Sequence, residues 1–272
     1  MFGKIALAGA ASLFALTGWT MAFGGEPADT AVGRIYHYVS SNADGSRARQ
    51  VYVYRAADNR LETYTMTRRC AEAGYATAWV DSGSGRAVVT THGRLMPGAR
   101  FENFAETNYD RGPRMLRASA TIGQRNAEGF ATIAEPAWHL YNLDLATLSI
   151  QTRGLSDRRA AFSFGLPAIA DNAGEDEHLV RDLGRAEARF VREEDYLGTP
   201  ALRFEVGGAA LGRQGGPLWL DAESGDVLGA QWGLPNRPGM ENFTLRLVKV
   251  DGGGEAAWRA LLASHFVGCA MA

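Results

Sequence analysis

The chain has 272 residues, of which 46% are hydrophobic, and a formal net charge of −2 at pH 7. This apolar fraction is typical of a globular protein and excludes an intrinsically disordered chain. No basic block stands out in the sequence, which argues against nucleic acid as a partner.

The first 22 residues have the pattern of a secretory signal peptide. Lys4 precedes an apolar run over residues 5–16, and the small residues Thr20 and Ala22 follow. The run is shorter than the ~20 residues that a helix needs to span a bilayer, and no later apolar stretch reaches that length. We therefore predict cleavage near Ala22 and a periplasmic or secreted protein without a membrane span. A retained anchor is the alternative.

Two cysteines are present, Cys70 and Cys269. In an oxidising compartment such a pair predicts a disulfide, here one that joins the early strands to the C-terminal end. The chain-entropy treatment gives a loop of this size at most roughly 5 kcal/mol. Two free buried thiols are the alternative. Neither cysteine has a second Cys or a His at zinc-ligand spacing, so we expect no metal and no cofactor.

The first third of the mature chain alternates with a period of two, in β-branched and aromatic runs. These runs cover residues 34–39, 50–54, 61–67, 75–80 and 86–92. Short polar turns at residues 42–45, 58–59 and 81–85 separate them. The pattern predicts a five-stranded antiparallel meander.

The middle of the chain is less uniform. Residues 93–114 are expected to be irregular because Pro97 and Pro113 interrupt them, and strands are expected to return at 115–122 and 129–134. Asn142 or Asp144 is then predicted to cap a short helix that ends before Gly154. A strand over residues 160–165 and an exposed polar loop over residues 171–177 follow.

The last third returns to strands. They are predicted at residues 185–193, 201–206, 217–220, 227–232 and 242–250. The turn at residues 221–226 predicts a hairpin. Trp258, Leu261, Leu262 and His265 recur at helical spacing, which predicts a terminal amphipathic helix over residues 255–266.

Around ten antiparallel strands with two helices exclude a parallel α/β fold, in which strands and helices would alternate. We predict a mainly antiparallel β fold, with a strongly curved sheet or half-barrel wrapped around one or two helices and a short C-terminal helix. A closed barrel and a sandwich are the alternatives. Residues 23–272 are expected to form a single domain, in which 33–134 and 155–250 could be two β sub-halves.

The second half, residues 140–250, resembles a group of uncharacterised exported bacterial β domains that are distantly similar to lipoprotein-carrier half-barrels. The matching positions are Asp144 to Leu148 with Arg153, Leu197-Gly198, Leu218 to Asp221 with Ser224-Gly225, and the strand over residues 243–250. The resemblance implies a half-barrel cavity that can hold an apolar molecule. It implies no activity and no functional residue.

Aromatic side chains are the candidate ligand-binding residues. Three successive strands are expected to place a stripe on one face, namely Tyr36, Tyr38, Tyr52, Tyr54 and Tyr64. This stripe either packs as core under a helix or lines a cavity for a ligand. Trp138, Trp219 and Trp232 could extend the wall of such a cavity or fill it.

Catalytic motifs are weak in this sequence. No serine lies in a Gly-x-Ser-x-Gly elbow, and no histidine pair has helical metal spacing. His37 and His92, each on a predicted strand, could meet in space. The sequence therefore favours an exported, non-enzymatic protein that binds or carries an apolar or amphiphilic ligand or docks a cell-envelope partner. The alternative is an exported hydrolase whose catalytic residues are dispersed along the chain.

Overall fold

The computed structural model describes residues 31–170 and 179–270. The predicted signal peptide (residues 1–22) and the predicted polar loop (residues 171–177) lie outside these ranges. The described residues all belong to one compact unit that begins at Ala31. None of the described helices combines the length and the apolar character that crossing a bilayer requires.

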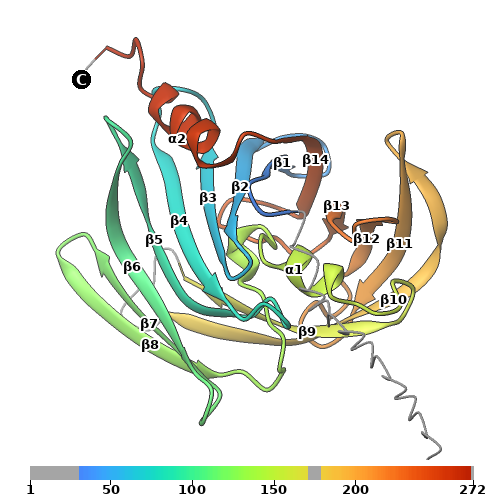
Figure 1. Ribbon diagram of the computed structural model, residues 1–272. Coiled ribbons are helices and arrows are strands. Elements are labelled where there is room, and N and C mark those ends of the chain that lie inside the picture. Colours follow the sequence, from blue (N-terminus) through green and yellow to red (C-terminus); the bar gives the residue numbers. More distant parts are fainter. Residues whose placement is uncertain (1–30, 171–178, 271–272) are drawn as a thin grey trace, which may run out of the picture. The chain divides into compact units, whose positions relative to one another are not determined.

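The described residues form one antiparallel sheet of fourteen strands (Figure 1). The first eight are β1 (Ile35–Ser41), β2 (Arg49–Ala57), β3 (Arg60–Met66), β4 (Ala73–Val80), β5 (Ala87–Met96), β6 (Arg100–Asp110), β7 (Met115–Ile122) and β8 (Arg125–Thr132). The other six are β9 (Phe162–Ile169), β10 (Val180–Tyr196), β11 (Thr199–Gly207), β12 (Gly216–Asp221), β13 (Val227–Trp232) and β14 (Phe243–Asp251). The predicted antiparallel fold is confirmed.

The strand order follows the chain in two runs that meet at the centre. It descends from β8 to β1, continues with β14, and descends again to β9. The first and last strands therefore pair with each other, while β8 and β9 are the two edges. Since these edges do not pair, the sheet is open rather than a closed barrel. It bends around a short helix that lies between β8 and β9 in the sequence (Figure 1).

Residues 93–114 are more regular than the sequence suggested. β5 continues to Met96, and β6 occupies Arg100–Asp110. Pro97 and Gly98 form the turn between these strands, with Gly98 at a φ of 79°, and Pro113 lies in the next turn. The expectation of irregular structure was wrong because both prolines lie in hairpin turns, where they interrupt no ladder.

Two helices and one 3-10 turn flank the sheet. The turn η1 (Tyr141–Leu143) and α1 (Leu148–Arg153) lie on one face, which we call the inner face. The C-terminal helix α2 (Gly254–Ser264) lies on the opposite, outer face. The helix before Gly154 is confirmed, but neither Asn142 nor Asp144 caps it, because α1 begins after Thr147 without a side-chain cap.

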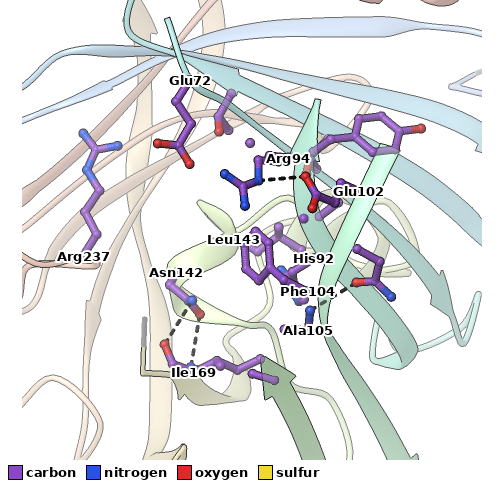
Figure 2. A pocket seen from close by; sticks show the side chains of 18 of the residues that line it. Glu72, His92, Arg94, Glu102, Phe104, Ala105, Asn142, Leu143, Ile169 and Arg237 are labelled. Carbon is purple, nitrogen blue, oxygen red and sulfur yellow. Dashed lines mark hydrogen bonds and ion pairs between the residues drawn. The ribbon is translucent and has the colours of Figure 1, made fainter. Parts of the chain in front are cut away.

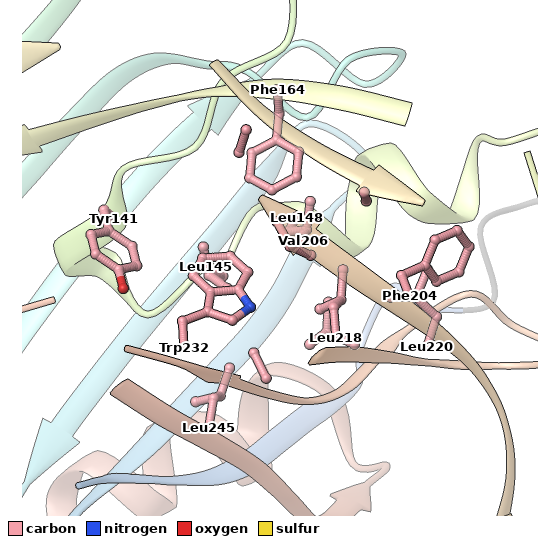
Figure 3. Close-up of a cluster of buried hydrophobic side chains, with 14 of the residues drawn as sticks. Tyr141, Leu145, Leu148, Phe164, Phe204, Val206, Leu218, Leu220, Trp232 and Leu245 are labelled. Atoms are coloured by element: carbon pink, nitrogen blue, oxygen red, sulfur yellow. The ribbon is translucent and has the colours of Figure 1, made fainter. Parts of the chain in front are cut away.

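Large side chains fill the inner face of the strands from β9 to β14 (Figure 3). Phe164, Phe204, Leu218, Trp232 and Phe243 are all at most 1% exposed. They pack against Tyr141 of η1, Leu148 of α1, and Leu145 between these two elements. We call this part the filled half of the inner face.

The outer face of β2–β5 is covered by α2. Trp258 stacks on Tyr54 at a ring-centroid distance of 5.4 Å and meets Tyr64 edge-on at 6.5 Å. Its indole Nε1 donates to the buried carboxylate of Glu62 at 2.6 Å, and the hydroxyl of Tyr75 donates to the same carboxylate. Burial of the aromatic rings and this shared carboxylate hold α2 in place.

The predicted disulfide is present. Cys70 and Cys269 are bonded, with a Cα–Cα distance of 5.5 Å across a sequence separation of 199 residues. The bond ties the end of the chain after α2 to the turn between β3 and β4. In the same place the guanidinium of Arg69 donates to the carbonyls of Ser264 and Val267.

Candidate functional site

A cavity of about 950 Å³ lies on the inner face of the strands from β2 to β7 (Figure 2). Its wall continues through the η1 segment (Asn142, Leu143 and Asp144), the end of β9 and Arg237. The mouth includes Thr67, Ala71 and Glu72 from the turn between β3 and β4. A volume of this size accommodates a drug-sized molecule or one acyl chain with its head group.

Small side chains create this space. The strand registers place Ala76, His92, Ala105 and Ala120 side by side across β4, β5, β6 and β7. Gly74 lies next to this row, and a Cβ there would come within 2.6 Å of the Thr65 hydroxyl. Because three of the four residues in the row are alanines, the inner face is hollow here. We call it the hollow half.

One end of the cavity is built on a buried carboxylate. Asp144 is 3% exposed and has a left-handed backbone with a φ of 51°. It accepts hydrogen bonds from Ser40 at 3.0 Å, Asn236 at 2.8 Å and Arg49 at 2.6 Å. These three donors satisfy the charge that burial would otherwise penalise, so Asp144 fixes η1 against β1 and β2.

His92 is the one titratable side chain in the alanine row. Its Nε2 lies 2.8 Å from Oγ1 of Thr90, and that oxygen lies 2.6 Å from Oγ1 of Thr107. The surrounding protein disfavours a charged imidazole and lowers the pKa of His92 to about 4. The ring is therefore neutral at pH 7, although part of its surface still faces the cavity.

The mouth combines opposite charges with an apolar edge. Arg94 and Glu102 form an ion pair at 3.1 Å, with about half of each side chain exposed. Figure 2 shows Glu72 and Arg237 facing the same opening, and Arg237 donates to the carbonyl of Arg47. Phe104 is 43% exposed at this edge. The mouth thus carries no strong excess of one charge.

The predicted aromatic stripe is divided between the two faces. Tyr36 and Tyr38 lie on the inner face, where their hydroxyls donate to Asp226 and to the carbonyl of Val227. These two tyrosines border a separate cavity of only about 30 Å³, which has room for a water molecule. Burial and Asp226 raise the pKa of Tyr36 well above its usual value.

Tyr52, Tyr54 and Tyr64 lie on the outer face, next to α2. The register of β1 and β2 places His37 opposite Tyr52, and Tyr36 opposite Val53. Tyr52 stacks on His37 at 4.4 Å and on Tyr64 at 5.4 Å. The prediction of one common face was correct for β2 and β3 and wrong for β1, because a register difference of one residue exchanges the faces.

The three candidate tryptophans lie away from the large cavity. Trp138 and Trp232 are fully buried in the hydrophobic core. Trp219 stacks on Tyr196 at 4.5 Å and donates to Glu194 at 2.6 Å, which lowers the pKa of Glu194. None of the eight aromatic candidates lines the 950 Å³ cavity. Ligand binding by these residues stays a prediction.

The two candidate catalytic histidines do not meet. His37 shares the outer face with Tyr52, whereas His92 faces the inner cavity. The cluster that these two histidines could have formed is therefore absent from the described structure. Within the described residues, the hydrogen-bond partner of the His92 ring is the hydroxyl of Thr90 rather than a carboxylate.

The residues that shape the cavity were missed in the sequence. Gly74 and Ala76 on β4 and Ala120 on β7 line the cavity, and the alternation of small residues continues into the packed core with Ala78 and Ala118. A row of alanine and glycine on one face of a sheet predicts a space there that no side chain of the sheet fills. The position of His92 within this row follows only from the register.

No protein-family model matches the chain, and no curated protein matches its sequence. A porin-like protein from Bacteroides uniformis is similar in structure, with 10% sequence identity and a TM-score of 0.24. The match covers 81% of this chain and 98% of that chain. A likeness at this level defines neither the fold nor the function of the present chain. The resemblance of residues 140–250 to lipoprotein-carrier half-barrels stays a prediction.

Proposed function

We propose that this protein is an exported binding protein that holds an amphiphilic molecule in the cavity of the hollow half. The observation that carries the proposal is the cavity itself, about 950 Å³ on the inner face of an otherwise well-packed sheet. A folded chain loses stability by leaving such a volume without side chains. A bound ligand offers a reason for retaining it.

The lining supports an amphiphilic rather than a purely apolar ligand. Val51, Ile122 and Leu143 give apolar surface along the cavity. Thr63 and Asn142 add polar groups, and the mouth carries the charged side chains described above. The lining thus presents polar and apolar surface in similar amounts, which suits a molecule that has both kinds of surface.

Two features support export. The first 22 residues have the pattern of a signal peptide. The disulfide of Cys70 with Cys269 is the second, because such bonds persist in oxidising compartments and are rare in the cytosol. Cys70 is exposed, so the small thiols of a reducing compartment would reach this bond directly and could reduce it.

The proposal is tested by native mass spectrometry of the protein isolated from its own cell envelope. We expect a mass above that of the polypeptide, and a bound species that dissociates on activation. The variant Ala120→Phe adds a ring to the cavity wall from β7 and should remove the extra mass.

The matched control is Ser119→Phe. Ser119 is the preceding residue on the same strand, is exposed, and does not line the cavity. It should retain the bound species. A wild-type spectrum without ligand, together with no thermal stabilisation by lipids or detergents, would contradict the proposal.

A further inference from the structure

His92 lies at the end of a short chain of hydrogen bonds that starts in the core. Thr107 is 1% exposed and Thr90 is fully buried, and their hydroxyl oxygens are 2.6 Å apart. Thr90 in turn lies 2.8 Å from Nε2 of His92. No other hydrogen bond to either threonine hydroxyl occurs within the described residues.

The direction of this chain follows from counting donors. Each hydroxyl has one hydrogen to donate, and a buried donor without an acceptor is costly. If Thr90 donated to Thr107, the hydrogen of Thr107 would have no acceptor. If Thr107 donates to Thr90 and Thr90 donates to Nε2 of His92, every hydrogen in the chain is used. Nε2 is then the acceptor, and the neutral ring carries its proton on Nδ1.

Nδ1 is the free end of the chain. It makes no hydrogen bond within the described residues. It is also not sealed from solvent, in contrast to the buried polar atoms that have no partner. Since His92 lines the cavity, this nitrogen is reached from there. Resting on the proposed function, we infer that His92 donates its Nδ1–H to an oxygen atom of the ligand, a carboxylate or a carbonyl.

Two other histidines, both buried, carry the ring proton on the other nitrogen, Nε2. Nε2 of His139 lies 2.9 Å from the amide oxygen of Gln151, whose amide nitrogen donates to the carbonyl of Ser163. Nε2 of His265 lies 2.8 Å from the carbonyl of Ala71. Oxygen acceptors at Nε2 require the proton to be there, so these two rings are Nε2–H.

Arg94 provides a second hydrogen-bond donor on the same face of β5. Arg94 follows His92 by two residues, so both side chains project from the inner face toward the cavity. Its guanidinium also pairs with Glu102 across the mouth. A ligand oxygen at Nδ1 of His92 would place the remainder of a polar head group toward Arg94 and the opening.

The tautomer is measured by NMR on purified protein labelled with ¹⁵N in histidine. Long-range proton–nitrogen spectra should show His92 as the Nδ1–H form and His139 as the Nε2–H form in the same sample. His92→Gln identifies the signal by its loss. Thr90→Val keeps the side-chain shape but removes the hydroxyl, and should move His92 toward the Nε2–H form. An Nε2–H form of His92 in the unchanged protein would overturn the inference.

Binding assays test the contact with the ligand, using myristate, methyl myristate and tetradecyltrimethylammonium as probes. His92→Leu should weaken binding of the two carbonyl-containing probes about tenfold, the effect of one lost hydrogen bond, and leave the cationic probe unchanged. A larger loss for myristate than for its ester would identify a carboxylate as the partner, and an equal loss a carbonyl.

The possible failures are distinguishable. If the wild type binds myristate and His92→Leu binds it equally well, the inferred contact is wrong while the proposed function stands. If the wild type binds none of the probes and carries no ligand from its envelope, the proposed function fails, whatever the tautomer of His92.

Discussion

The two halves of the inner face share one sheet and one strand geometry but differ in side-chain volume. In the filled half, Phe164, Phe204 and Trp232 are buried in one hydrophobic cluster with Leu148 of α1. In the hollow half, Ala76, Ala105 and Ala120 stand at comparable inward positions and a cavity remains. The curved backbone therefore does not decide whether the sheet encloses a ligand or its own core. The volume of the inward side chains decides it.

The halves also differ in whether a ligand could reach their unpaired polar atoms. Near the filled half, the carboxylate of Asp226 accepts hydrogen bonds from Tyr36 and Arg153, whereas Nε1 of Trp232 is sealed in the core without a partner. In the hollow half, His92 retains a ring nitrogen without a partner in the described residues. The two unpaired nitrogens differ in access, because His92 lines the cavity and Trp232 does not, so only His92 can meet a ligand there.

The largest expected difference concerns the loss of inward volume. Trp232→Ala should lower the free energy of unfolding by about 3–5 kcal/mol, because the surrounding core cannot close the space. Ile122→Ala, on the wall of the cavity, should cost at most about 1.5 kcal/mol, since the Ile122 side chain is only partly buried and borders an existing space. Urea unfolding measures both. Equal losses would contradict the division into two halves.

The second difference concerns pH. Burial lowers the pKa of His139 to about 4, below the ordinary value near 6.5 of an unfolded chain. The unfolded state therefore binds the proton first as pH falls, so stability is complete above about pH 6.5 and decreases toward pH 4. For the fully buried His139 the loss is on the order of 3 kcal/mol.

The comparison with His92 sharpens this prediction. His92 has a similarly lowered pKa, but its ring is partly exposed in the cavity, so its contribution should be smaller. Urea unfolding at pH 7.5, 5.5 and 4.5 should give a flatter pH dependence for His139→Gln than for the wild type, with a lesser change for His92→Gln. An unchanged slope in His139→Gln would refute the assignment.

The third and smallest difference concerns added volume. Ala230 is fully buried between Leu218 and Leu245, and Ala230→Phe should cost about 1–3 kcal/mol by overpacking. Ala120→Phe places the same ring into the cavity and should leave the melting temperature nearly unchanged. Differential scanning calorimetry of the ligand-free proteins compares them directly. A comparable loss in Ala120→Phe would mean that its site is already packed.

Much of the fold could be predicted from the sequence because its signals are local. The alternation in β2 to β5, the turn at residues 221–226 and the helical spacing of Trp258 and Leu262 each lie within one segment. The disulfide was predictable because the chain has only two cysteines. Among the described strands, β6 has no counterpart in the prediction, because Pro97 and Pro113 were interpreted as breaks rather than as hairpin turns.

The site could not be predicted because it depends on register and on missing volume. The aromatic stripe failed at β1, where the turn places His37 rather than Tyr36 opposite Tyr52. The row of Ala76, His92 and Ala105 depends on pairings between strands, including a bulge between His92 and Gly93. No residue type indicates a bulge of this kind in advance.

A crystal structure of the protein purified from its own envelope without delipidation tests the central claim most directly. The account predicts continuous electron density between Thr63, His92 and Ala120, with an oxygen atom within hydrogen-bond distance of Nδ1 of His92. A cavity that contains only water, or one closed by inward movement of β5 and β6, would contradict it.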